Sequence, residues 1–463
     1  MADSYTTAAA LREEILSSAS GARGFIAGLF DEGTFLETGT YIRNAGDDRN
    51  FEGVITGCGA VNGRLVFAYI QDYSNGRGAF TQAGAEKITA LYRKAIKAGA
   101  PVVGVFDSAG AKLGEGISAL SGIGAVIAQA AAAKNAVPQV AVIAGACGGG
   151  MAAVASLADF VIADSSRGEL YVLPESGKSD RQGVKRASLY AEGTDGLAAK
   201  TRELLAYLPE NSSEGTVYTV APEDINVPAE GVEDLVSGDV KELIPVIADS
   251  RDFYEISADF AKEMVCGFAA VNGKVVGVVA NQPVVNGGAL TAKAAKKAAG
   301  FVDFLGRFGI PVLTLVNSVG FGGGNCGCYA GNLADLASAY TSCRSAKVTV
   351  VTGAAYGSAF TLMGSKNLGA DMVFALDSAV ISVMAPETAV EFVWDDRLKS
   401  SADPAQARQE LRSEWEATAA SPLSAARQGD ADDVIAFSEL KQRIAALVGE
   451  MIEKAYPQAQ GLP

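Results

Sequence analysis

The chain has 463 residues, of which 49% are hydrophobic and 20% charged, a balance typical of globular domains. Its formal net charge of −15 argues against a nucleic acid or an anionic membrane surface as the main partner. The chain contains no histidine, which excludes Ser-His-Asp and Cys-His catalysis. Any chemistry must therefore depend on backbone amides, carboxylates, Lys, Tyr or an outside cofactor.

The N-terminal stretch MADSYTTAAALREEIL lacks the basic start and apolar core of a signal peptide. No apolar stretch reaches the ~18 uncharged residues that would indicate a membrane span. Six cysteines lie scattered along the chain, which favours a reduced, cytoplasmic protein over a disulfide framework. Only Cys326 and Cys328 are close together, and without histidine we expect small residues on a glycine-rich loop there and no metal site.

The two halves of the chain repeat one another. AVNGRLVFAYIQD (60–72) recurs as AVNGKVVGVVANQ (270–282), an offset of 210 positions, as between Asn62 and Asn272. The order of apolar runs and turns predicts the same series in each half: a strand pair joined by an Asn-Gly turn, a helix, a strand, a helix, a strand, a glycine loop and a helix. Strands that alternate with helices in this way indicate parallel βαβ units.

The stretch between the repeats is rich in Pro, Ser, Glu and Asn and predicts a linker over 204–228. We therefore expect domains over 1–225 and 240–463. Within the first, the alanine run at 125–133 predicts a buried helix. At the end of the second, the apolar spacing predicts a helix over 438–456.

A glycine loop follows a buried strand in each half: GACGGGMA (145–152) and GAAYGSAF (353–360). The first lacks the Lys-Ser/Thr of a P-loop and the third glycine of a dinucleotide fingerprint, and Ser358 has no histidine to activate it. Backbone N–H groups at a helix start, next to residues without a large side chain, are typical of an oxyanion hole. For one loop alone, close packing of the helix would be the simpler explanation; two copies favour the oxyanion hole.

The motifs together resemble a known family, the carboxyltransferase (β-type) subunits of biotin-dependent acyl-CoA carboxylases and of sodium-pumping acyl-CoA decarboxylases. Propionyl-CoA carboxylase β and methylmalonyl-CoA decarboxylase α are members. The resemblance implies an α/β fold of tandem duplicated crotonase (ClpP/crotonase-like) domains. It covers nearly the whole chain and depends on LFDEGTFLE (29–37), GVITGCGAVNGRLVFAYIQD (53–72), GAPVVGVFDSAGAKLGEG (99–116), GFAAVNGKVVGVVANQP (267–283), GIPVLTLV (309–316), AYGSAFTLMGSKNLGAD (355–371) and ASPLSAARQGDADDVI (420–435).

This resemblance implies that a carboxyl group moves between biotin and a short-chain acyl-CoA, in the carboxylase or the decarboxylase direction. The ureido nitrogen of biotin then serves as the base, and the protein holds two oxyanions. The first domain would bind acyl-CoA and the second biotin. The residues carried over are Gly149, Gly150, Ser358 and Ala359 as catalytic, Gly110, Ala111, Lys112 and Gly148 for acyl-CoA, and Gly357, Phe360, Thr361, Gly320 and Phe321 for biotin.

The chain has no Met-Lys-Met-type biotin attachment site, so a separate biotin carboxyl carrier protein is implied as a partner. Either a biotin carboxylase or membrane decarboxylase subunits would complete the complex. Members of the family commonly form hexamers built from dimers, with the site between the first half of one chain and the second half of its partner.

Two stretches depart from the family's pattern. NSVGFGGGNCGCYAGNLADLA (317–337) has Val319 where a proline is usual and lacks a His-Gly pair, and GKSDRQGVKRASLYAEG (177–193) replaces a histidine-bearing loop. An inactive or scaffold paralogue in a carboxylase complex therefore stays an alternative. A second alternative is an enoyl-CoA hydratase or isomerase, with Glu115 as its acid or base.

Overall fold

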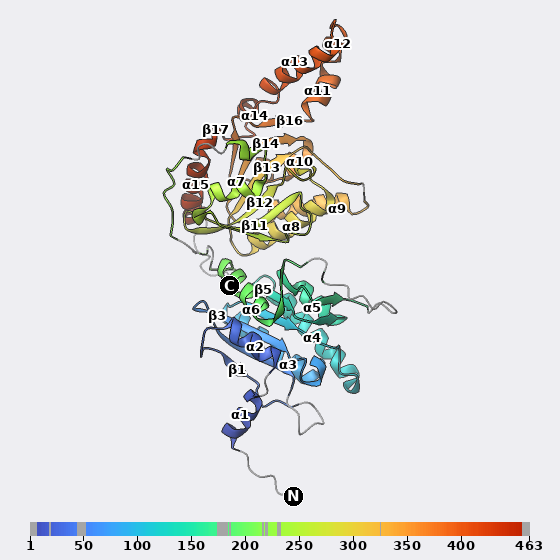
Figure 1. Ribbon diagram of the computed structural model, residues 1–463, viewed down its shortest axis with the longest axis vertical. Coiled ribbons are helices and arrows are strands. Elements are labelled where there is room, and N and C mark those ends of the chain that lie inside the picture. The colour runs from blue at the N-terminus through green and yellow to red at the C-terminus, as the bar shows by residue number, and fades with distance from the viewer. Residues whose placement is uncertain are drawn as a thin grey trace. The chain divides into compact units, whose positions relative to one another are not determined.

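The two halves of the repeat fold into separate units. The structure is a computed structural model that describes residues 7–17, 20–43, 52–173, 184, 187–214, 217, 221–228, 233–324 and 326–455. The first unit comprises residues 1–214 and the second residues 215–463 (Figure 1). The predicted linker starts too early, because Leu204 and Leu205 are buried in the last helix of the first unit.

The first unit contains the predicted series of strands and helices. Its elements are α1 (Ala8–Ser17), α2 (Gly21–Leu29), β1 (Leu36–Thr38), β2 (Val54–Val61), β3 (Arg64–Gln71), α3 (Gln82–Ala98), β4 (Val102–Phe106), α4 (Ile117–Ala133), β5 (Gln139–Ile143), β6 (Ala146–Gly148), α5 (Gly150–Leu157), β7 (Phe160–Asp164), β8 (Glu169–Tyr171), β9 (Leu189–Ala191) and α6 (Gly193–Tyr207).

The second unit repeats this series and adds helices at its end. Its elements are α7 (Val240–Ile247), β10 (Phe253–Ile256), β11 (Met264–Val271), β12 (Lys274–Asn281), α8 (Ala292–Arg307), β13 (Val312–Ser318), α9 (Tyr329–Ser342), β14 (Lys347–Tyr356), α10 (Gly357–Leu362), β15 (Met372–Leu376), β16 (Val380–Ser382), α11 (Pro386–Val393), α12 (Asp395–Lys399), α13 (Pro404–Ala417), α14 (Pro422–Gln428), β17 (Asp433–Ile435) and α15 (Leu440–Ala455).

Each unit is built on one sheet with the same topology. The strand order is β1-β2-β3-β4-β5-β7-β9 in the first unit and β10-β11-β12-β13-β14-β15-β17 in the second. The first three strands of each order pair antiparallel and the others parallel. The parallel strands place their carboxyl ends, and the glycine loops that follow β5 and β14, at one edge of each sheet.

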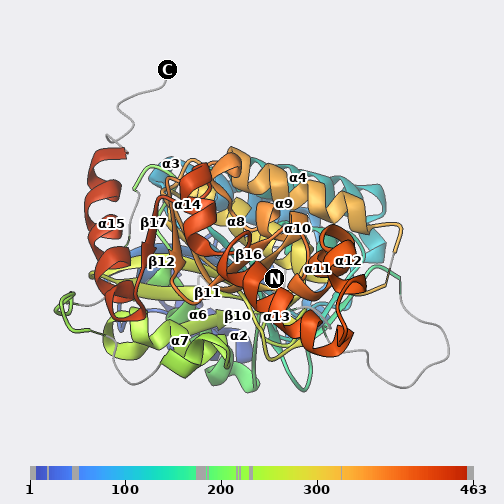
Figure 2. The same cartoon turned by 90° about the horizontal axis from the view of Figure 1, so that it is seen from above.

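Helices cover both faces of each sheet, which explains why the central strands are almost continuously apolar. In the first unit, Phe67, Phe106 and Ile143 pack with α3, α4 and α5 on one face. Ile70 and Val105 meet α2 and α6 on the other face. In the second unit, α8 and α9 lie on one side of the strands and α7 on the other (Figure 2).

Helices α11 to α13 form an arm that extends away from the second sheet (Figure 1). A small apolar cluster holds the arm together, with Trp394 and Trp415 in an edge-to-face contact at 5.0 Å between ring centroids. No helix among the described residues is long and apolar enough to span a membrane.

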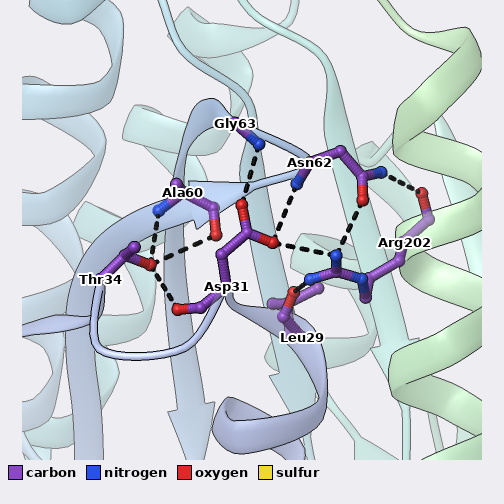
Figure 3. Close-up of polar contacts among 7 residues, drawn as sticks. All are labelled: Leu29, Asp31, Thr34, Ala60, Asn62, Gly63 and Arg202. Atoms are coloured by element: carbon purple, nitrogen blue, oxygen red, sulfur yellow. Dashed lines mark hydrogen bonds and ion pairs between the residues drawn. The ribbon is translucent and has the colours of Figure 1, made fainter.

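The Asn-Gly hairpin turn is fixed by a carboxylate, as Figure 3 shows. Asn62 and Gly63 both have positive φ, 52° and 77°, the geometry of a two-residue hairpin. Asp31 accepts the Gly63 N–H at 2.8 Å and the Asn62 N–H at 3.2 Å. The Arg202 guanidinium donates to Asp31 at 2.9 Å and to the Leu29 carbonyl at 2.6 Å. This cluster joins α2, the hairpin and α6.

We expect Asp31→Asn to destabilise the chain near neutral pH. The hydrogen bond from Gly63, followed by that from Arg202, holds the pKa of the Asp31 carboxyl below its usual value of 3.8. A lowered folded-state pKa stabilises the fold fully above 3.8, and the stabilisation disappears as pH falls through the lower, folded-state value. Urea unfolding of both proteins, near neutral pH and in acid, should show a difference in midpoint that shrinks in acid. A difference independent of pH would contradict this assignment.

Candidate active site

Each of the three consecutive glycines where β6 ends and α5 begins has a different structural reason. A Cβ on Gly148 would lie 2.5 Å from the Tyr171 ring, and one on Gly150 would lie 2.5 Å from Cγ2 of Ile123. Gly149 has φ of 60° and ψ of −131°, which strongly favours glycine, and no atom lies within 4 Å of its Cβ position. Gly148 and Gly150 are therefore explained by close packing. Gly149 leaves open space above the loop.

Backbone N–H groups are available at the start of α5. The Gly149 N–H is donated to the Tyr171 carbonyl at 3.1 Å, which fastens the loop to β8. Gly150 and Met151 follow in the first helical turn, where N–H groups have no partner inside the helix. The partial positive charge of the helix start favours an oxyanion at that position.

The loop after β4 lies directly beside this glycine loop. The Ser108 N–H donates to the carbonyl of Ala146 in β6 at 2.9 Å. Ser108 Oγ in turn accepts the Gly110 N–H at 3.0 Å, and Gly110 has φ of 111° with open space at its Cβ position. Ala111 pairs with Phe80, and Lys112 Nζ lies 3.7 Å from Glu115 Oε1. The structure therefore brings the predicted acyl-CoA residues together with Gly149 and Gly150.

The second unit builds the same arrangement with other side chains. Gly357 has φ of 61° and opens α10 as Gly149 opens α5. Strand β16 pairs with the end of β14, at Ala354 to Tyr356, as β8 pairs with β6. Ala359 is fully buried, and the side chains of Ser358 and Thr361 are exposed. The first N–H groups of α10 have no partner inside the helix.

The loop after β13 completes this second arrangement. Ser318 Oγ accepts the Gly320 N–H at 3.3 Å, and Gly320 has φ of 113°, closely matching Gly110. The Cβ position of Gly320 lies 3.7 Å from the Tyr356 carbonyl, so the loop adjoins the start of α10. Phe321 pairs with Leu290, is 49% exposed and lies edge-to-face with Tyr329 at 6.1 Å. The predicted biotin residues of this unit therefore lie together.

Three residues near these loops were missed by sequence reasoning. Tyr171 and Ile123 lie far along the chain from the glycines they contact, so no local pattern indicates them. The repeat could have indicated Met151 from the sequence, because its offset of 208 pairs Gly150 with Ser358 and Met151 with Ala359. The repeat therefore points to Gly150 and Met151 as the counterparts of the predicted pair Ser358 and Ala359.

Charged groups lie around the loops. Burial raises the pKa of Asp107, although Arg167 lies 3.0 Å away and opposes the shift. Burial, and then the charges of Glu387 and Glu416, raise the pKa of Tyr356 at the start of the second loop. Within the described residues, no three His, Cys, Asp or Glu side chains gather as a metal site.

Known proteins are similar to this chain over most of its length. The family model of the carboxyl transferase domain matches residues 21–174 and 181–455. The chain is 34% identical to the carboxyltransferase subunit of propionyl-CoA carboxylase from Haloferax mediterranei, with 92% of this chain and 89% of that protein covered. It is 34% identical to the methylmalonyl-CoA decarboxylase subunit alpha of Propionigenium modestum, with 91% and 88% covered.

A solved structure agrees with the fold. The transcarboxylase 12S structure, a hexamer with hydrolysed methylmalonyl-coenzyme A bound, superposes with a TM-score of 0.88 at 30% identity. The match covers 98% of this chain and 93% of that one. The expected tandem crotonase-like fold is confirmed.

Proposed function

The chain belongs to the carboxyl transferase family, as its motifs indicated, and it is a biotin-dependent acyl-CoA carboxyltransferase; we propose that its two glycine loops are the two oxyanion holes of that reaction. In this proposal the first loop, at Gly149 and Gly150, receives the thioester carbonyl. The second, at Gly357 to Ala359, receives the ureido carbonyl of biotin. The observation that carries the proposal is the matching geometry of the loops, with φ of 60° at Gly149 and 61° at Gly357, where the two helices begin.

The first loop fits a thioester carbonyl. The empty space at the Cβ position of Gly149 leaves room for the carbonyl, and Gly150 and Met151 supply N–H groups at the helix start. The Gly149 amide is donated to Tyr171, so we assign Gly149 to the shape of the loop and Gly150, with Met151, to donation. Gly148 belongs to the wall, because it makes room for Tyr171.

The neighbouring loop would hold the rest of the acyl-CoA. Gly110 and Ala111 expose backbone beside the hole, and Lys112 carries a positive charge at its rim, where a CoA phosphate would be attracted. The nearest carboxylate on this loop, Glu115, is held in place: its Oε2 accepts the Gln82 N–H at 2.7 Å, and its Oε1 lies 3.7 Å from Lys112 Nζ. The protein supplies donors here and leaves the role of base to another group.

The second loop fits a neutral cofactor carbonyl. Gly320 and Phe321 adjoin the start of α10, and Phe360 and Thr361 follow in the same helix. When bound, biotin would supply a ureido nitrogen as the carrier of the carboxyl group and as the base for the α-proton of the thioester. The N–H groups of Ser358 and Ala359 would stabilise the ureido oxygen as negative charge develops on it.

We propose the propionyl and methylmalonyl thioesters as the substrate class. The relatives named above act on these compounds, and the identity extends over nine tenths of the chain. We further propose a separate biotin carboxyl carrier protein as the partner, together with a biotin carboxylase or membrane decarboxylase subunits. We also propose that the chain forms a homo-oligomer of six copies, as in the 12S structure, and that it is located in the cytoplasm.

The decisive experiment incubates the purified chain with methylmalonyl-, malonyl- or glutaconyl-CoA, with and without free biotin, and follows each thioester by chromatography. We expect biotin-dependent loss of methylmalonyl-CoA. Loss of another thioester alone would contradict the substrate class. If none reacts, even with carrier-bound biotin, and the chain still joins a carboxylase complex, the scaffold alternative replaces the proposal.

Glu115→Gln distinguishes carboxyl transfer from an enoyl-CoA hydratase. Glutamine keeps a side-chain oxygen that can accept the Gln82 N–H, so we expect the transfer rate to stay within about threefold and stability to fall by roughly 0.5–1 kcal/mol. A hydratase that uses Glu115 as its acid or base would instead lose about 10²–10⁴-fold. The rates of carboxyl transfer and of enoyl-CoA hydration are measured for the wild-type protein and for Glu115→Gln. A large loss of carboxyl transfer would instead indicate that Glu115 is a catalytic residue of that reaction.

A further inference from the structure

The loop between β13 and α9 carries two exposed thiols. Cys326 and Cys328 are both exposed, with only Gly327 between them, and no atom lies within 4 Å of the Cβ position of Gly327. Among the described residues, no third metal-ligating side chain joins them. The proposed function leaves this pair unused.

A backbone turn holds the two cysteines close together. The Tyr329 N–H donates to the Cys326 carbonyl at 3.0 Å, and this tight turn holds Cys326, Gly327 and Cys328 together. The neighbouring Cys328 thiol, followed by nearby backbone N–H groups, lowers the pKa of Cys326, and Cys326 in turn raises the pKa of Cys328. Cys326 is therefore the better nucleophile, and Cys328 is its neighbouring proton donor.

The geometry allows a bond between them. Residues two apart in a chain are separated by at most ~7 Å between Cα atoms, close to the range of about 4.4–6.8 Å seen in disulfides. Gly327 has no side chain to resist the turn that closes the ring. No other pair of cysteines in the chain is so close in sequence.

The remaining cysteines provide an internal comparison. Cys147, Cys266 and Cys343 are buried, and burial raises the pKa of Cys147 and of Cys266 to about 12. Cys58 is half-buried in β2 and has no cysteine beside it in sequence. Only the pair on the loop combines exposure with a neighbouring thiol.

We propose that Cys326 and Cys328 form a dithiol modification site, oxidised by hydroperoxides to an intramolecular disulfide. The Cys326 thiolate attacks a peroxide oxygen, the O–O bond breaks, and Cys326 becomes a sulfenic acid while water or an alcohol leaves. The Cys328 sulfur then attacks the Cys326 sulfur, the S–S bond forms, and the sulfenic oxygen leaves as water. Two electrons pass from the two thiols to the peroxide.

The disulfide would also act on the second glycine loop, a consequence that depends on the proposed function. Tyr329 directly follows Cys328 and donates to the carbonyls of Leu290 and Gly322, and its ring contacts Phe321. Closing the ring at Cys328 strains the start of α9 and moves this anchor. We expect the oxidised chain to transfer carboxyl groups about tenfold or more slowly, with recovery on reduction by dithiothreitol.

The test treats the reduced, full-length chain with hydrogen peroxide and digests it with chymotrypsin. The enzyme cuts after Phe321 and Tyr329 and so separates the pair from Cys343, which trypsin would leave in the same peptide. We expect peptide 322–329 to lose two hydrogen atoms well before Cys58 reacts. Cys328→Ser should stop at a dimedone-reactive sulfenic acid, Cys326→Ser should not react there, and Cys58→Ser should behave as wild type.

The outcomes separate the two proposals. Oxidation of Cys326 no faster than of Cys58, or disulfides only between chains, would overturn the modification site, whatever the transfer assay shows. A disulfide with an unchanged transfer rate would overturn only its link to the second loop. A reduced chain inactive with every thioester bears on the proposed function alone, because the mass measurement needs no activity.

Discussion

Ser358→Pro should lower the rate of carboxyl transfer by about 10²–10³-fold, because it removes one N–H donor from the second oxyanion hole. Proline is tolerated in the first turn of a helix, where its missing N–H has no helical partner. The preceding residue, Gly357, has no Cβ for the proline ring to strike. The fold should therefore survive the loss of the donor.

Ser358→Ala is the matched control for this variant. It removes the exposed hydroxyl and keeps the N–H, so its transfer rate should stay close to that of wild type. Thermal unfolding of both variants checks that α10 is intact. If Ser358→Ala loses as much activity as Ser358→Pro, the hydroxyl and not the backbone is the working group. If Ser358→Pro keeps full activity in a folded chain, the second loop is no oxyanion hole.

Gly150→Val should reduce the rate of carboxyl transfer by about 10²-fold or more, because it disturbs the N–H donors of the first glycine loop. Its Cβ would lie 2.5 Å from Cγ2 of Ile123, so the Ile123 side chain, α4 or the start of α5 must shift. A displacement of about 1 Å at a catalytic donor costs on the order of 10²-fold in rate. Steady-state kinetics with methylmalonyl-CoA and biotin measure the loss, and we expect it in kcat.

A second substitution distinguishes packing from chemistry. Ile123→Ala removes as many carbon atoms as valine adds at position 150, so the double variant should recover stability and much of the rate. Gly124→Ala in the same helix has open space around its Cβ and should leave the rate unchanged. If the double variant folds as well as wild type and stays inactive, the valine itself obstructs the substrate, and the packing explanation of Gly150 is wrong.

Gly149 and Gly357 show what the sequence repeat alone predicts about the site. Two glycine loops at a constant offset, with no histidine in the chain, already favoured paired oxyanion holes over nucleophilic catalysis. Positive φ at both glycines agrees with that expectation. The hairpin turns at Asn62 and Asn272 were predicted in the same way, because Asn-Gly between apolar runs specifies a local backbone conformation.

The roles of the residues around the first glycine loop could be assigned only from contacts between segments that are far apart in the chain. Tyr171 accepts the Gly149 N–H and excludes a side chain at Gly148, and Ile123 excludes one at Gly150. Glu115, a candidate acid or base in the sequence, accepts an N–H at the start of α3. The sequence by itself determined the duplication and the order of elements, because these follow from local pattern, and the resemblance of its motifs to a family indicated the class of chemistry. The contacts of Tyr171 and Ile123 with the glycines were decided only by the tertiary structure, because they arise where segments far apart in the chain meet.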